Sequence, residues 1–147
     1  MAIPGLVLLL AACGSTYSGS TLAQQVSSWA KSTGFSAELS TVQGDIRLVD
    51  SLSTPSGSLG SHASVIKTAC AVLVQDTLTA NQNLPTPDQT LTDLLSTAYS
   101  KAGGAGHDCY SGAGHDNDLL SRSATQRVTA RRDLIKALAR FDLVTTG

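Results

Sequence analysis

The sequence predicts an all-α protein, a small up-and-down bundle of four to five helices held by one disulfide. In successive segments, apolar residues recur every three or four positions, and Gly, Pro, Ser or Thr separate the segments. Aromatic side chains make up only 4% of the 147 residues, so the core must be aliphatic, which suits helix packing better than a β-sandwich. No segment shows the apolar–polar alternation that is typical of a β-hairpin.

The first two helices are predicted on either side of Gly34. Thr21 and Gln24 have the spacing of a capping box. One apolar stripe then follows at helical spacing and ends at Gly34; it consists of Leu22, Val26, Trp29 and Ala30. The second helix carries a heptad-like stripe, made of Phe35, Leu39, Val42, Ile46 and Val49.

A loop at residues 53–60 should lead to two longer helices. Ser61 is expected to cap the third helix, which runs to about Asn83. Thr86 at the N-cap and Pro87 in the first turn predict the start of the fourth. The expected buried face of the third helix consists of Ile66, Ala69, Cys70, Leu73, Thr77 and Leu78, and Val65, Val72 and Val74 widen this face. The expected buried face of the fourth helix consists of Leu91, Leu94, Leu95, Ala98 and Ala102.

Residues 103–117 are rich in glycine and contain the pentapeptide Gly-Ala-Gly-His-Asp twice, starting at Gly104 and at Gly112. This composition predicts a loop. A last helix should follow over residues 118–143. Its buried face is expected to contain Leu120, Ala124, Val128, Ile135 and Leu138, with Leu134 and Phe141 beside them.

Cys70 and Cys109 are the two cysteines of the predicted helical domain. Outside the cytoplasm such a pair most simply forms a disulfide; free thiols and metal ligation are the alternatives. Two straight helices that turn near Pro85 would leave the two sulfur atoms about 13 Å out of register, at 1.5 Å per residue. We therefore expect the glycines of residues 103–106 to bend the chain back if the disulfide forms.

Two histidines of the glycine-rich segment suggest a weak metal site. His107 and His115 would bind zinc or copper together with Cys109 or Asp116, since these are the residue types that such metals use. The spacing matches no closed zinc site, however, and Cys109 is also the predicted disulfide partner. The competing interpretation is a solvated surface loop, so no cofactor is expected.

The last helix is unusually basic for a chain whose net charge is −1. Its bases either face the acidic remainder of the domain or contact anionic lipid headgroups or an acidic wall polymer. Nucleic acid is not an expected partner. The residues concerned are Arg127, Arg131, Arg132, Lys136 and Arg140.

No catalytic motif is present in the sequence. No Gly-x-Ser-x-Gly elbow or Ser-x-x-Lys pair places a serine at a strained turn, and the chain lacks a phosphate-binding loop and a dinucleotide fingerprint. A single tryptophan, placed on an apolar stripe, argues against a sugar-cleaving cleft. We therefore expect a protein that is not an enzyme.

The N-terminus resembles a bacterial lipobox. Leu10-Ala11-Ala12-Cys13 follows an apolar run that is too short to span a bilayer, which needs about twenty residues, and its length suits a signal sequence. The resemblance implies a signal peptide at residues 1–12, a lipidated Cys13 with a flexible tether at residues 13–20, and a helical domain at residues 21–147. One feature departs from the pattern: a signal peptide usually begins with Lys or Arg, and residues 1–5 carry no basic side chain.

The chain is similar to small secreted or lipid-anchored helical proteins of actinobacteria, over residues 63–110 of the helical domain. The likeness depends on the lipobox, on Thr68-Ala69-Cys70, and on residues 83–88 ahead of an amphipathic helix that contains Tyr99. The likeness carries over no activity or site. From the lipobox and the catalytic motifs considered above, we expect a protein on the extracytoplasmic face of the cell membrane, with a non-enzymatic binding or structural role toward an envelope protein or the wall. An extracytoplasmic metal or small-ligand module that uses His107 and His115 is the alternative.

Overall fold

The computed structural model describes residues 19–53 and 59–147, and all regular structure in these residues is helical. The fold is a helical bundle, as predicted. Its five elements are α1 (Leu22–Thr33), α2 (Phe35–Leu52), α3 (Leu59–Gln82), α4 (Gln89–Gly112) and α5 (Asn117–Thr146).

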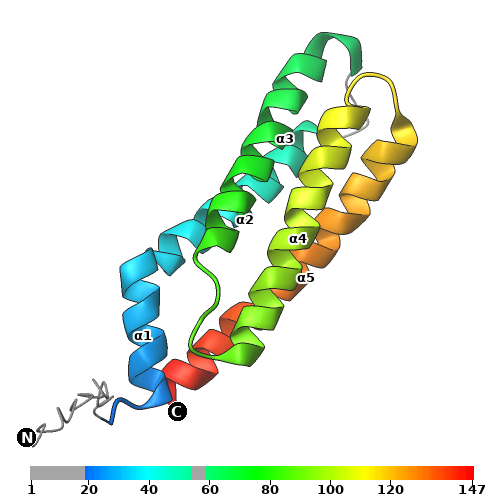
Figure 1. Cartoon of the computed structure of the whole chain (residues 1–147). Helices are drawn as coiled ribbons and strands as arrows, with labels where there is room; N and C mark the ends of the chain where they lie inside the picture. Colours follow the sequence, from blue (N-terminus) through cyan, green and yellow to red (C-terminus); the bar gives the residue numbers. More distant parts are fainter. Residues whose placement is uncertain (1–18, 54–58) are drawn as a thin grey trace, which may run out of the picture.

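The three longest helices, α3, α4 and α5, run side by side in an up-and-down arrangement (Figure 1). Helix α2 packs on α3, and α1 turns away from α2 to reach the C-terminal end of α5. The first residues of α1 and the C-terminus therefore lie at the same end of the molecule (Figure 1).

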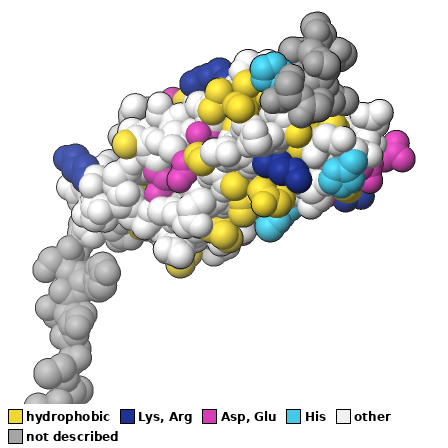
Figure 2. Space-filling model, turned by 90° about the horizontal axis from the view of Figure 1, so that it is seen from above, with side chains coloured by type: hydrophobic (Ala, Val, Ile, Leu, Met, Phe, Trp, Pro, Cys, Tyr) yellow, Lys and Arg dark blue, Asp and Glu magenta, His cyan; other side chains and the backbone are white. Residues whose placement is uncertain are grey.

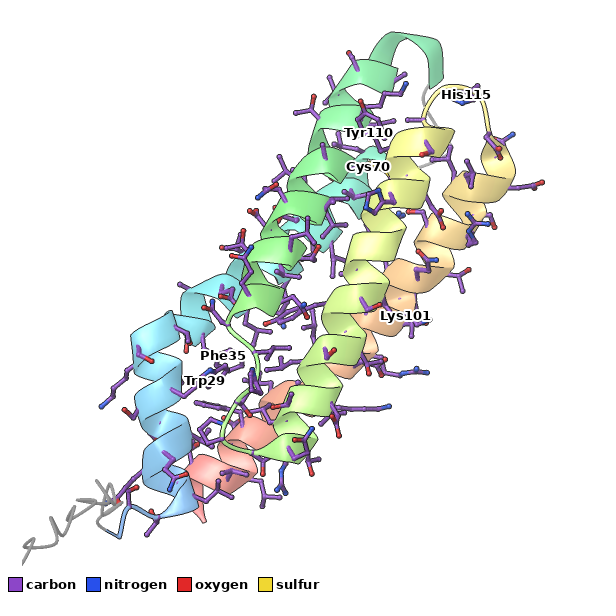
Figure 3. The ribbon with its side chains drawn as sticks, in the orientation of Figure 1. Trp29, Phe35, Cys70, Lys101, Tyr110 and His115 are labelled. Carbon is purple, nitrogen blue, oxygen red and sulfur yellow. A yellow bond between two sulfur atoms is a disulfide. The ribbon has the colours of Figure 1, made fainter. Side chains whose placement is uncertain are left out.

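The two predicted N-terminal helices are present, although Leu22 of the predicted first stripe is exposed. Thr21 and Gln24 form the capping box, and Gly34 ends α1 in the left-handed region at φ 68°, where glycine has no steric penalty. Trp29 and Phe35 meet across this corner with ring centroids 5.1 Å apart (Figure 3), and Phe141 of α5 packs on Phe35 at 5.0 Å. The whole predicted stripe of α2 is buried.

Helix α4 continues through the segment that the glycine content predicted to be a loop, so that prediction was wrong. A Cβ atom on Gly106 would lie 2.7 Å from Val74 Cγ2 and 2.9 Å from the Cys70 carbonyl oxygen. One on Gly112 would lie 2.8 Å from Leu119 Cβ. These glycines allow α3 and α5 to approach α4 closely, and the resulting packing outweighs the low helix propensity of glycine.

Cys70 and Cys109 form the predicted disulfide, with Cα atoms 5.8 Å apart, and both are fully buried. The predicted bend at residues 103–106 is absent. Cys70 lies twelve residues before the end of α3 and Cys109 twenty after the start of α4, a mismatch of about 12 Å. Residues 83–88, which we call the linker, descend past the end of α3 before α4 begins (Figure 1) and so supply this offset.

The N-cap of α4 is Asp88 rather than the predicted Thr86. The Asp88 carboxylate accepts a hydrogen bond from the Leu91 backbone N–H at 2.7 Å. The Thr86 hydroxyl instead donates to the Asp88 carbonyl oxygen at 2.7 Å. Helix α3 begins at Leu59, so Ser61 lies inside the helix and does not cap it.

The predicted buried face of α5 was largely wrong, because the helix is rotated so that mainly small and polar residues face the bundle; of the predicted residues, Leu134 is fully buried. Ser123 is fully buried and donates from its hydroxyl to the Ala105 carbonyl oxygen at 2.7 Å. Arg127 is 3% exposed and bonds to both Ser123 and Asp50. The predicted core residues Ala124, Val128, Ile135 and Leu138 are exposed, as are Val65, Val72 and Leu78 on α3.

Candidate functional site

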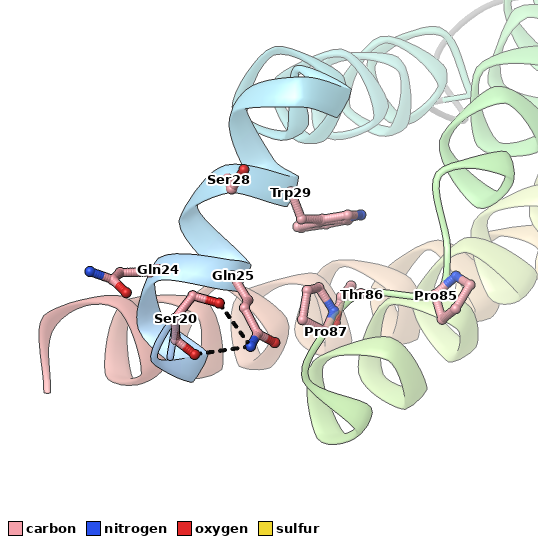
Figure 4. Close-up of a pocket in the computed structure, with 8 residues that line it drawn as sticks. All are labelled: Ser20, Gln24, Gln25, Ser28, Trp29, Pro85, Thr86 and Pro87. Atoms are coloured by element: carbon pink, nitrogen blue, oxygen red, sulfur yellow. Dashed lines mark hydrogen bonds between the residues drawn. The ribbon is translucent and has the colours of Figure 1, made fainter. Parts of the chain in front are cut away.

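A hollow with a volume of about 760 Å³ lies between α1 and the linker (Figure 4). None of its lining side chains is charged. Four polar residues of the α1 end, a tryptophan, and two prolines and a threonine of the linker line it; Figure 4 shows Gln25 extending toward the linker and Gln24 away from it. The lining residues are Ser20, Gln24, Gln25, Ser28, Trp29, Pro85, Thr86 and Pro87.

Trp29 is held in one orientation. Its indole N–H donates to the Asn83 carbonyl oxygen at 2.9 Å, and its ring packs against Phe35. Figure 4 shows the ring projecting from α1 toward the linker, with Gln25 and Pro87 beneath it. The hollow therefore has a rigid aromatic wall.

Asn83 connects this wall to a polar cluster in the bundle. Its side-chain amide donates to Glu38 Oε2, and the Tyr99 hydroxyl donates to Glu38 Oε1 at 3.3 Å. Burial raises the pKa of Glu38, although both hydrogen bonds lower it. Burial and the neighbouring Glu38 carboxylate raise the pKa of Tyr99. Glu38 of α2 and Tyr99 of α4 thus hold Asn83 of the linker, whose carbonyl oxygen accepts the hydrogen bond from Trp29.

The other side of the hollow is fixed through Asp88. Arg140 of α5 makes two hydrogen bonds to the Asp88 carboxylate, at 3.0 and 2.7 Å. These bonds lower the pKa of Asp88 although burial raises it. The Asp88 backbone N–H donates to Thr86 Oγ1 at 3.1 Å, and the Thr86 N–H donates to Thr92 Oγ1 at 2.9 Å. These hydrogen bonds fix the linker backbone, and with it the position of the linker prolines.

Three polar groups in the hollow have no partner among the described residues: the Ser28 hydroxyl, the Gln24 amide nitrogen and the Gln25 amide oxygen. The Gln25 amide nitrogen donates to the carbonyl and hydroxyl oxygens of Ser20 (Figure 4). Donors and acceptors beside an aromatic ring, without any charge, suit an uncharged polar ligand that has one flat apolar face.

Sequence reasoning missed this site because Trp29 was assigned to the core on its stripe position. Trp29 is only partly buried and packs at the edge of the core. The missed signal is the pair of prolines around Thr86, together with the polar residues on the neighbouring turns of α1. Their proximity depends on the path of the linker, which residue spacing does not reveal.

The residues of the predicted metal site are spread apart. His107 is exposed on α4, and His115 lies in the turn before α5 (Figure 3). Asp116 caps α5, accepting from the backbone N–H groups of Asp118 and Leu119, and Cys109 is in the disulfide. The histidines in Figure 2 stand apart from one another. Among residues 19–53 and 59–147, no three His, Cys, Asp or Glu side chains gather as metal ligands would.

The predicted basic face divides into two groups. Arg127 is buried, which corrects its assignment to the surface, and Arg140 turns inward to Asp88. Arg131 pairs with Asp50, and Arg132 and Lys136 each lie 3.3 Å from Asp133 Oδ1. Arg131, Arg132 and Lys136 remain exposed, so the outside of α5 has a basic surface that is smaller than predicted.

Cys13 and the lipobox lie outside the described residues. Within the part of the chain that is described, no helix combines the length and apolarity needed to cross a bilayer. Comparison with known proteins finds no match: no family model, curated protein or solved structure resembles the chain.

Proposed function

We propose that this chain is a lipid-anchored protein of the extracytoplasmic membrane face that binds an envelope ligand and does not catalyse a reaction. The lipobox at Leu10–Cys13 supports the anchor. The buried Cys70–Cys109 disulfide supports the compartment, because such bonds persist in oxidising environments and are rare in the cytosol.

The observation that carries the binding role is the uncharged hollow beside Trp29. A flat indole ring stacks on the apolar face of a sugar ring, and the Ser28 and Gln25 side chains can exchange hydrogen bonds with its hydroxyl or acetamido groups. The fixed ring and linker limit the conformational entropy lost on binding. We therefore assign the hollow to an uncharged saccharide, the chemistry of a wall glycan.

Trp29 is the only tryptophan of the chain, so its fluorescence reports on the hollow directly. Titration with an N-acetylhexosamine oligosaccharide should give a saturable change in emission. Ser28→Leu should weaken binding about tenfold, through the loss of one or two hydrogen bonds. Ser40→Leu, on the exposed surface of α2, is the matched control and should bind like the parent chain. No saturable change, or equal behaviour of the two variants, contradicts the assignment.

A further inference from the structure

The outward face of α5 combines large apolar residues with bases. Val128, Ile135 and Leu143 are 64%, 60% and 64% exposed, and Leu138 at their edge is 39% exposed. Residues 128 and 135 are seven apart, which places them on one side of the helix. The described residues leave the first three of these side chains mostly uncovered, since the buried face of α5 is the opposite one.

Three bases surround this apolar stripe. The side chains of Arg131, Arg132 and Lys136 are 46%, 64% and 54% exposed. The acid shared by Arg132 and Lys136 is Asp133, which is only 7% exposed. The cationic groups of Arg132 and Lys136 therefore face outward while their counter-charge lies beneath them, and Arg131 pairs with the partly exposed Asp50 of α2. Asp142 is the one exposed acid in residues 128–146.

We propose that this face of α5 lies on the surface of an anionic bilayer, an inference that depends on the proposed lipid anchor. Exposed aliphatic side chains flanked by Arg and Lys are the pattern by which a helix lies in a membrane interface. Bases near such a surface are attracted by its negative potential. The charge therefore favours a lipid surface over a second copy of the chain, whose α5 would present the same positive face.

The position of the tether brings this face to the membrane. Helix α1 starts beside the C-terminal end of α5 (Figure 1), where Ala23 and Thr145 line one shallow hollow. Residues 14–21 connect a lipidated Cys13 to that end. Eight extended residues reach about 28 Å at most. An anchored domain therefore keeps the last turns of α5 close to the bilayer, where a helix of about 45 Å can lie flat.

The test uses the native lipoprotein, reconstituted into vesicles of phosphatidylcholine alone or with phosphatidylglycerol. An environment-sensitive fluorophore is attached to Ala139→Cys on the outward face of α5, or to Thr97→Cys on the exposed side of α4 as the matched control. We expect at least a twofold rise in emission at position 139 in the anionic vesicles and no change at position 97. High salt should reverse the rise.

Two further variants separate charge from apolar contact. Arg132→Gln with Lys136→Gln should remove most of the rise, and Ile135→Ser should reduce it while leaving every ion pair in place. A label at position 139 that stays in water on vesicles to which the protein is anchored overturns the inference. A signal that appears equally on neutral vesicles and grows with protein density also overturns it, in favour of self-association. Failure of the chain to float with either vesicle refutes the anchor itself.

Discussion

The same substitution at two helical glycines should change stability in opposite directions. Gly106 lies in α4 where a Cβ atom would come within 2.9 Å of the backbone oxygen of Cys70, which the disulfide holds in place. Gly44 lies inside α2, where a Cβ atom would meet nothing within 4 Å. Gly106→Ala and Gly44→Ala therefore test the packing of α3 on α4 against helix propensity alone.

The magnitudes follow from two opposing contributions to the free energy of unfolding. Alanine in place of glycine inside a helix stabilises by about 1 kcal/mol, which is the expected gain at Gly44. At Gly106 the extra methyl group has no room, and overpacking of this kind costs about 1–3 kcal/mol. The contact with a backbone oxygen places the cost at the upper end, so Gly106→Ala should lose about 1–2 kcal/mol overall.

The assay is thermal unfolding followed by circular dichroism, with the disulfide intact. A change of 1 kcal/mol corresponds to about 3–5 °C for a domain of this size. The two variants should therefore differ in Tm by roughly 6–15 °C, with Gly44→Ala the more stable. If Gly106→Ala is neutral or stabilising, then residues 103–112 do not pack as a helix against α3 and this part of the account is wrong.

Three further perturbations have defined outcomes. Reduction of the disulfide should lower the free energy of unfolding by about 4 kcal/mol in the chain-entropy model, measured in urea; an unchanged midpoint would contradict this. Arg127→Ala should lower the free energy of unfolding by about 2–3 kcal/mol, because it leaves groups in the core without a partner. Arg131→Ala removes an exposed partner of the same Asp50 and should lower it by less than about 0.5 kcal/mol. Equal losses for the two variants would refute the assigned burial of Arg127. Burial, and after it the neighbouring Asp76, raises the pKa of Asp45 to about 6. Because the folded protein holds this proton more tightly than the unfolded chain does, the stability that is present below the unfolded pKa is lost as the pH rises through about 6. Asp45→Asn should remove that pH dependence and gain about 1 kcal/mol at pH 7, and a loss at pH 7 would contradict the sign.

Local patterns predicted those parts of the fold that depend on local geometry. The capping box at Thr21, the left-handed Gly34 and the buried stripe of α2 each involve residues within a few turns of one another. The disulfide was also predicted, from the number of cysteines and the expected compartment. Its geometry was not, because the offset of α4 comes from the path of the linker.

The larger errors arise from contacts between distant segments. The glycines of α4 were assigned to a loop because their intrinsic propensity is low, yet they are the positions where α3 and α5 come closest. The rotation of α5 follows from the partners of Ser123 and Arg127 on α4 and α2. The exposed apolar stripe that results is invisible to a periodicity argument, which assigns every apolar face to the core. The hollow beside Trp29 was missed for the same reason.

The central claim, an extracytoplasmic protein anchored by lipid at Cys13 and closed by the Cys70–Cys109 disulfide, is tested most directly by the intact mass of the chain purified from its native membrane. We predict a polypeptide that begins at Cys13, carries a diacylglyceryl group, and is two hydrogen atoms lighter than its reduced form. A chain that retains residues 1–12, without lipid and with three reduced thiols, would contradict the account.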